Sequence, residues 1–493
     1  MRDYPKLSKA LNAYNALSVE MRATLWFIVC NCIQKGILLI TIPIFTRIMS
    51  VEQYGVYGVY HTWSNLFSVF ITLNFAGGVL NNGMLKFRGN KASFISSVQA
   101  LTTVMTTGWL AVYVLFRMRI NALLDLSTPM MLCMFAEILL NASFSLWAAW
   151  ERYEYRYKAL TLSTAFFAVV SVIIPPLCVL FLSGPENAAQ SRIFGTLITE
   201  FISYGWVYLY VGLQGRTFAS RTYWAYVLKF NVPLLPHYLA MMLLAQIDRV
   251  MIKTMTGERE AGIYTLAYSL AICLQVVTTA IGQGFTPWLY RKLNEDDFRG
   301  IPQLITIQLI VMAVMILLLA FLSPEIIALI STQEYWEASF VIAPVASSTF
   351  FIFVYQLLGN FEFYFYKNIF IAIASGVAAV LNIALNWVFI RLFGYLAAGY
   401  TTLFSYAALA FMHCAFVMVV LKEHYGTVKP FLDVKSIAWL SLLTILGSVV
   451  AISLYGCFSI RLLAVLATLA ALFVKRKDIM ERLGQKNERG NAL

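Results

Sequence analysis

The sequence predicts an all-α protein that is embedded in a membrane and crosses it about 14 times. The first observation is composition: of 493 residues, 60% are hydrophobic and only 12% are charged. The second is pattern, because apolar runs of helix length alternate with short polar gaps. A helix of about 20 apolar residues crosses a hydrocarbon layer of about 30 Å. No gap is long enough for an inserted soluble domain, so the whole chain is predicted to be one multi-pass membrane protein.

Windows of helix length give the individual spans. They are predicted at 23–46, 57–83, 94–116, 129–150, 160–182, 193–213, 226–250, 263–289, 303–323, 338–358, 368–390, 396–421, 436–455 and 458–474.

An internal repeat divides these spans into two lobes of six helices. Gly55-Val56-Tyr57 matches Gly262-Ile263-Tyr264, and the two copies begin six spans apart. An even number of crossings gives both copies the same orientation, so the pseudo-twofold axis should run along the membrane normal. The predicted parts are an N-terminal tail 1–22, an N-lobe 23–213, a linker 214–225, a C-lobe 226–421, two further helices within 436–474, and a C-terminal tail 475–493.

Basic residues give the orientation. They collect in the two tails and in every second gap, whereas the gap 323–337 on the opposite side contains no Lys or Arg. Because cytoplasmic loops carry the excess of Lys and Arg, both termini and the linker are predicted to be cytoplasmic. The net charge of +12 therefore reflects topology, and nucleic acid is not an expected partner.

Lys35 is a cation near the middle of the first span. Such a residue costs about 2.5–3.5 kcal/mol on insertion scales and usually faces protein or water. Asn31 and Gln34 fall on the same side of the predicted helix. This side is predicted to line a hydrated interior.

Two polar stripes occupy matching positions of the repeat. His61, Asn65, Ser68 and Thr72 recur at helical spacing in the second span, and Gln275 and Thr279 begin a similar stripe in the eighth. The stripes indicate either hydrogen bonds between helices or the lining of a hydrated cavity.

Five further ionisable residues considered at membrane depth are His237, Asp248, Arg249, Glu137 and Glu200. Asp248 and Arg249 either form an ion pair at a helix end or act in transport, and His237 either bonds to a neighbouring helix or faces the cavity. Each of the acids Glu137 and Glu200 is a candidate proton or cation site, or a partner for Lys35. We predict that Glu137, Glu200 and Asp248 are the coupling candidates.

Several classes of protein are disfavoured by what the sequence lacks. The seven cysteines are odd in number and lie in or beside apolar runs without metal-ligand spacing, so they are predicted to be free thiols. No catalytic constellation or Walker-type glycine-rich loop occurs. We therefore expect no metal, no cofactor and no enzymatic activity.

The chain resembles the Wzx-type polysaccharide and O-antigen flippases of the multidrug/oligosaccharidyl-lipid/polysaccharide (MOP) exporter superfamily. The resemblance covers almost the whole chain and is carried by the order of short motifs rather than by any one of them. These motifs are Lys35-Gly36, Ile42-Pro43-Ile44-Phe45-Thr46-Arg47, Glu52-Gln53-Tyr54-Gly55-Val56-Tyr57, Lys229-Phe230, Pro233-Leu234-Leu235-Pro236-His237, Asp248-Arg249 and Gly262-Ile263-Tyr264.

The resemblance implies a two-lobe transporter of the bacterial inner membrane. It would move an oligosaccharide on a polyprenyl diphosphate to the outer leaflet by alternating access, coupled to H⁺ or Na⁺, with membrane lipid and other glycan-assembly proteins as partners. The cationic cleft would be formed by Lys35, Arg47, His61, His237 and Arg249. A drug/cation antiporter of the same superfamily, a membrane glycan polymerase or ligase, and a scaffold of the assembly machinery are the alternatives.

Overall fold

A computed structural model describes residues 18–182 and 184–470. Within these ranges every regular element is a helix, which confirms the predicted all-α fold class. Eleven of the described helices are long and apolar enough to cross a membrane. The long helices α3 and α8 and the short apolar helix Phe458–Ala470 bring the number to 14, consistent with the prediction.

The elements follow one another as α2 (Val19–Ile48), α3 (Val51–Thr72), α4 (Gly78–Lys86), η1 (Arg88–Asn90), α5 (Lys91–Leu124), α6 (Thr128–Tyr153), α7 (Tyr157–Phe181), η2 (Pro185–Asn187), α8 (Ala188–Gly215), α9 (Arg221–Asn231), η3 (Val232–Leu234), α10 (Leu235–Met255), α11 (Glu258–Ile272), α12 (Gln275–Asn294), α13 (Ile301–Ile330), η4 (Gln333–Tyr335), α14 (Ala338–Tyr364), α15 (Asn368–Phe393), α16 (Ala397–Tyr425) and α17 (Val434–Ser453).

Three predicted spans are interrupted rather than continuous. The span predicted at 57–83 breaks after α3, where Leu73 and Asn74 adopt positive φ and end the helix. The span predicted at 226–250 passes through the 3₁₀ turn η3, which contains Pro233. Proline has no N–H for the helical ladder, so a turn is favoured there. The span predicted at 263–289 breaks between α11 and α12.

The chain divides into two compact units. The first consists of Met1–Met49 and Trp63–Leu239, and the second of Ser50–Thr62 and Ala240–Leu493. The first half of α3 therefore belongs with the second unit, whereas its second half belongs with the first. The lobe boundaries and the pseudo-twofold axis given from the sequence stay predictions.

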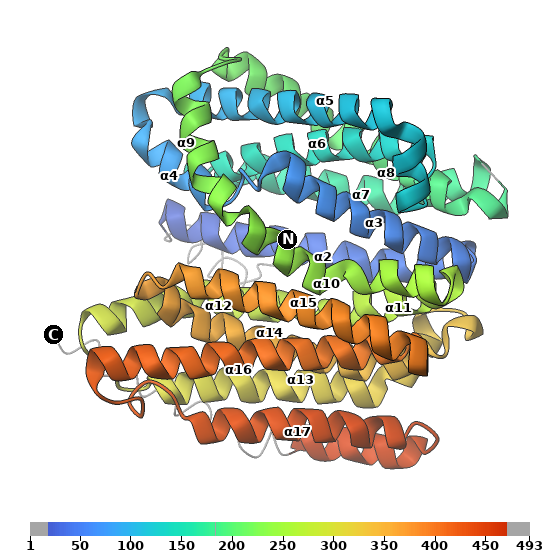
Figure 1. Cartoon of the computed structure of the whole chain (residues 1–493), viewed down its shortest axis with the longest axis vertical. Helices are drawn as coiled ribbons and strands as arrows, with labels where there is room; N and C mark the ends of the chain where they lie inside the picture. The colour runs from blue at the N-terminus through green and yellow to red at the C-terminus, as the bar shows by residue number, and fades with distance from the viewer. Residues whose placement is uncertain (1–17, 183, 471–493) are drawn as a thin grey trace, which may run out of the picture. The chain divides into compact units, whose positions relative to one another are not determined.

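The core of the first unit lies among α4, α5, α6, α8 and α9 (Figure 1). Its large buried members are aromatic: the rings of Phe144 and Tyr204 stack at 4.1 Å, and Phe94 packs edge-on to Tyr223 at 5.5 Å. Offset and edge-on aromatic pairs add about 0.5–1.5 kcal/mol beyond area burial. They fix the positions of α6 and α8, which carry the acids Glu137 and Glu200.

The second unit is organised around α14, because 89% of the residues in the most apolar stretch of this helix are buried. At the edge of this unit, α17 packs along α13, as Figure 1 shows. The last described helix is fastened to α13 by Arg461, whose guanidinium donates to both carboxylate oxygens of Glu325 at 2.6 and 2.7 Å. A two-pronged bond of this kind fixes orientation as well as distance.

Candidate functional site

A carboxylate in the second unit is enclosed by polar side chains from three neighbouring helices. Asp248 on α10 is 1% exposed. Its Oδ2 accepts hydrogen bonds from the hydroxyls of Tyr264 on α11 and Thr402 on α16, both at 2.6 Å. Its Oδ1 accepts from the Nδ2 of Asn386 on α15, also at 2.6 Å. Three short bonds to an ionised acceptor stabilise the charged form of this side chain where water is excluded.

A second layer of oxygens surrounds this carboxylate. Asn382 and Asn386 lie one helical turn apart on α15, and the Nδ2 of Asn386 lies 3.2 Å from the Oδ1 of Asn382. The hydroxyl of Thr401 donates to the Oδ1 of Asn386. All of these side chains are buried. One carboxylate with several neutral amide and hydroxyl oxygens is the donor set that hard cations such as Na⁺ prefer. We call Asp248, Tyr264, Asn382, Asn386, Thr401 and Thr402 the Asp248 cluster.

Arg249 does not neutralise this carboxylate. Its guanidinium lies over the ring of Tyr268, 4.2 Å from the ring centre. The three partners of Asp248 are neutral groups, so the ion pair that the sequence allowed between Asp248 and Arg249 is not formed. The hydrogen bonds to Asp248 therefore all come from neutral groups, while Arg249 acts on the carboxylate only through its nearby charge.

The two copies of the repeated motif meet within the second unit. A Cβ added to Gly55 on α3 would lie 2.0 Å from the carbonyl oxygen of Glu258, and a Cβ added to Gly262 on α11 would lie 2.0 Å from the carbonyl oxygen of Val51. Each glycine thus contacts the residue four positions before the other. Only glycine allows two helix backbones to approach so closely.

The first unit contains a different acidic site. Glu137 on α6 and Glu200 on α8 are both buried, and they lie near enough for their charges to interact. The Nδ2 of Asn141 donates to Glu200 Oε1 at 2.8 Å and to the Glu137 carbonyl at 3.0 Å. The other oxygen, Glu200 Oε2, is buried without a hydrogen-bond partner. The Asn141 amide therefore joins the Glu200 carboxylate on α8 to the backbone of α6.

The structure places the other predicted site residues on separate helices. Lys35 lies on α2, and its side chain is outside the described part of the structure. Asn31 is half-buried and Gln34 exposed on the same helix, and the exposed Arg47 donates to the Pro43 carbonyl at 3.0 Å.

The polar stripes occupy α3 and α12. His61 is exposed and Asn65, Ser68 and Thr72 are half-buried, while Gln275 is half-buried and Thr279 exposed. His237 is half-buried on α10 beside the ring of Tyr238. Further along α12, the Thr286 hydroxyl donates to Asn360 Oδ1 of α14 at 2.8 Å, so part of this stripe forms a bond between helices. The roles of these residues in a cleft stay predictions.

Sequence reasoning missed most of the Asp248 cluster. Asn382 and Asn386 are four residues apart in an apolar run, which was a usable signal, and they were overlooked because they carry no charge. It also missed the buried pair formed by Glu362 and His413, in which Nδ1 lies 2.8 and 2.9 Å from the two carboxylate oxygens. Glu362 escaped notice because the span predicted at 338–358 ends before it, whereas α14 continues to Tyr364.

The fold is similar to those of solved multi-pass transporters. The structure of the lipid II flippase MurJ in an inward closed conformation superimposes with a TM-score of 0.69 over 93% of this chain and 100% of MurJ, at 12% identity. An inward-facing multidrug resistance MATE family transporter of the MOP superfamily gives 0.61 over 79% of this chain and 96% of its own, at 10% identity.

Residues 21–293 match the model of the polysaccharide biosynthesis protein family, and the chain belongs to this family. A protein of the Lsg locus of Haemophilus influenzae is 20% identical over 374 residues, which cover 73% of this chain and 88% of that protein. These matches confirm the resemblance to the polysaccharide flippases of the MOP superfamily that the order of short motifs predicted.

Proposed function

We propose that this protein is a flippase that carries an oligosaccharide linked to a polyprenyl diphosphate from the cytoplasmic to the outer leaflet. The family supports the saccharide, and the MOP fold supports transport rather than catalysis. The observation that supports an ion-coupled mechanism is the buried Asp248 carboxylate, whose three hydrogen-bond donors are all neutral groups. A buried charge of this kind is expected to be functional.

Sodium is the coupling ion that the Asp248 cluster fits best. The buried carboxylate and the amide and hydroxyl oxygens beside it are the kind of oxygen ligands that suit a metal cation. Replacing the hydrogen bonds with Na⁺ requires the hydroxyls of Tyr264 and Thr402 to turn and the Asn386 amide to present its oxygen. Binding would therefore change how α10, α11, α15 and α16 pack, and the energy of the sodium gradient would act through this change.

The glycine contact is a close packing that we expect transport to require. Gly55 and Gly262 allow α3 and α11 to approach at backbone distance within one compact unit. A larger side chain at either position would force the two helices apart.

Lys35 is our candidate for the diphosphate group or an acidic sugar of the cargo. Arg47, His61, His237 and Arg249 would complete the cationic wall of the cleft. A lipid carrying a diphosphate requires cations in a hydrated cleft that is open to the bilayer. In cells, Lys35→Ala is expected to abolish surface glycan while the amount of protein stays normal, and normal glycan would remove Lys35 from the mechanism.

The direct test uses vesicles that contain the purified protein and a fluorescent polyprenyl-diphosphate oligosaccharide. Inward sodium, proton and drug gradients are imposed separately, and movement of the saccharide between leaflets is followed by its accessibility to a soluble lectin. Sodium-dependent movement of the saccharide is expected. Export of a cationic dye with no movement of the saccharide would instead identify a drug/cation antiporter.

A matched pair of variants tests the glycine contact. Gly262→Ala places a methyl group against the Val51 carbonyl, so we expect transport to fall at least tenfold. Gly282→Ala, on α12, meets no atom within 4 Å and is expected to leave transport unchanged. Equal activity of both variants would exclude a mechanical role for the close approach.

A further inference from the structure

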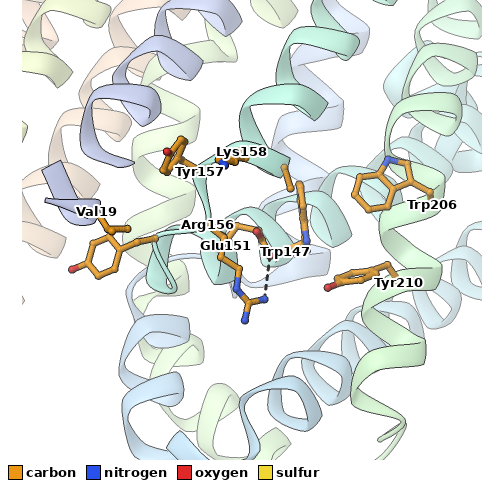
Figure 2. A pocket seen from close by; sticks show the side chains of 10 residues that line it. Val19, Trp147, Glu151, Arg156, Tyr157, Lys158, Trp206 and Tyr210 are labelled. Carbon is orange, nitrogen blue, oxygen red and sulfur yellow. Dashed lines mark ion pairs between the residues drawn. The ribbon is translucent and has the colours of Figure 1, made fainter. Parts of the chain in front are cut away.

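A pocket of about 580 Å³ lies in the first unit, where α6 ends and α7 begins. Its walls combine aromatic rings with charged groups, as Figure 2 shows for Trp147, Trp206, Tyr210, Arg156 and Lys158. Trp147 and Glu151 come from α6, Arg156 and Lys158 from the following turn and the start of α7, and the other two rings from α8. This mixture of rings and charges is typical of the level of the lipid headgroups.

The charges of the pocket are divided between a buried acid and exposed cations. The side chain of Glu151 is 4% exposed, and the nearest oxygen lies 3.9 Å from a guanidinium nitrogen of Arg156 (Figure 2). This distance allows attraction without a close bond, and the Arg156 side chain is still 53% exposed. Lys158 is also exposed. The acid therefore holds Arg156 at the wall, while both cations remain available to an anion.

The pocket adjoins a surface of exposed apolar side chains. Along α7, the exposed large side chains Leu162, Phe166, Val169 and Ile173 recur at helical spacing, and Lys158 lies one turn before the first of them. Along α8, the exposed stripe runs through Ile202, Trp206, Leu209 and Leu213. Trp206 belongs both to this stripe and to the pocket wall. The polar pocket thus lies at one end of the two exposed apolar stripes of α7 and α8.

We propose that this pocket binds the headgroup of an anionic phospholipid, with Arg156 and Lys158 contacting its phosphate and with acyl chains lying along the exposed stripes of α7 and α8. Basic pockets between transmembrane helices on the cytoplasmic side bind phosphorylated headgroups. The pocket lies on the side whose basic residues predict a cytoplasmic location. Its Trp and Tyr rings are of the type enriched at membrane interfaces, and they surround a space that a glycerophosphate group can occupy.

A resident phospholipid fits this site better than the transported cargo does. The exposed stripes lead to bulk lipid, and the pocket volume suits a glycerophosphate group more closely than a diphosphate carrying several sugars. The lipid would join α6, α7 and α8 at one end, with the first turn of α2 at Val19 also contacting the site. The expected consequence is a more stable first unit.

The test measures lipid binding to the full-length protein in a neutral detergent. Phosphatidylglycerol with brominated acyl chains quenches tryptophan fluorescence, and its titration gives an affinity; the thermal unfolding temperature is recorded in parallel. Brominated phosphatidylcholine, inorganic phosphate and a short-chain isoprenyl diphosphate are the comparison probes. Each cation near a phosphorylated surface strengthens binding severalfold, so Arg156→Ala with Lys158→Ala should weaken phosphatidylglycerol binding about thirtyfold.

The matched control is Arg117→Ala with Arg119→Ala, which removes two exposed cations from α5 outside the pocket. It is expected to bind phosphatidylglycerol as the wild type does, and a Lys158→Gln single variant covers the case in which the double variant fails to fold. The proposal is overturned if the pocket and control variants bind equally, or if phosphatidylcholine or inorganic phosphate reproduces the effect. It is also overturned if the isoprenyl diphosphate binds there more tightly than phosphatidylglycerol, since the pocket would then belong to the cargo.

Discussion

The buried acids of the two units are solvated in opposite ways. In the second unit, both oxygens of Asp248 accept short hydrogen bonds, three in all, from three different helices. In the first unit, Glu200 Oε1 accepts from the Asn141 amide, which also donates to the Glu137 backbone carbonyl, and Glu200 Oε2 is buried without a hydrogen-bond partner. Burial alone therefore does not give a carboxyl group its role, because the number of donors around it decides which form the site favours.

This difference suggests that Asp248 and the pair Glu137 and Glu200 have different roles. Both oxygens of Asp248 are hydrogen-bonded among neutral oxygen-bearing side chains, whereas one oxygen of Glu200 has no donor. We therefore infer that the Asp248 cluster is the sodium site and that Glu137 and Glu200 have a structural role. The following predictions would break or sharpen this comparison.

The largest difference is expected when each acid is removed. Asp248→Ala would leave three buried donors without their acceptor, and each such donor costs about 1–3 kcal/mol. We expect the free energy of unfolding to fall by about 3 kcal/mol. Glu200→Ala removes the acceptor of one Asn141 donor, which keeps the Glu137 carbonyl, so a loss of about 1 kcal/mol is expected. Chemical unfolding in detergent measures both, and equal losses would contradict the contrast.

A single donor to Asp248 should have an intermediate effect. Tyr264→Phe removes one bond to a charged group, for which about 1.5 kcal/mol is a usual cost. Tyr268→Phe is the matched control, because it keeps the ring beneath the Arg249 guanidinium. We expect the control to change stability by less than about 0.5 kcal/mol. A larger loss in the control would mean that the Tyr268 hydroxyl, rather than the hydrogen bond from Tyr264, supports the cluster.

Neutral mimics of the acids in the first unit should have little effect. Glutamine resembles a protonated glutamate in shape, so Glu200→Gln should change the free energy of unfolding by no more than about 0.5 kcal/mol. Sodium-driven movement of the saccharide is also expected to continue in this variant. Transport measured under imposed sodium and proton gradients tests both points. Loss of the sodium response in Glu200→Gln would join the two acidic sites in one mechanism.

An exposed carboxylate gives the baseline for these effects. Asp433 caps α17 by accepting from the Ser436 N–H at 3.1 Å and from its hydroxyl at 2.6 Å, and these bonds lower the pKa of Asp433. Loss of such a cap typically costs about 1 kcal/mol, so Asp433→Ala should destabilise the protein about as much as Glu200→Ala and less than Asp248→Ala. Because the folded-state pKa is lowered, the stabilisation is present above the unfolded-state pKa and is lost as pH falls through the folded value. Unfolding measured from pH 7 to pH 3 should show this loss in the wild type and a smaller one in the variant.

The sequence was sufficient for the fold class because hydropathy and length identify most spans directly. It failed where a span is broken locally: nothing in the apolar pattern signalled that Leu73 and Asn74 would take positive φ. For the site, it identified Asp248 by its charge but not Asn382, Asn386 or Thr402, because neutral polar residues are frequent in membrane helices. Such residues become informative only when the fold brings four helices together.

The repeat shows the same limit in another form. The match between Gly55 and Gly262 was visible as two similar motifs six spans apart. That the two glycines contact each other's helix backbone could not be read from either motif, because similarity of sequence gives no distance. Lys35 likewise stays a prediction from its energetic cost alone.

The central claim is tested most directly by sodium binding to the purified protein in detergent at neutral pH, measured with radioactive ²²Na⁺. The wild type and Glu200→Gln are expected to show saturable binding of equal affinity, whereas Asp248→Asn, which keeps the size of the side chain, should bind at least tenfold more weakly. Undiminished sodium binding by a folded Asp248→Asn variant would contradict the assignment of the Asp248 cluster as the coupling site.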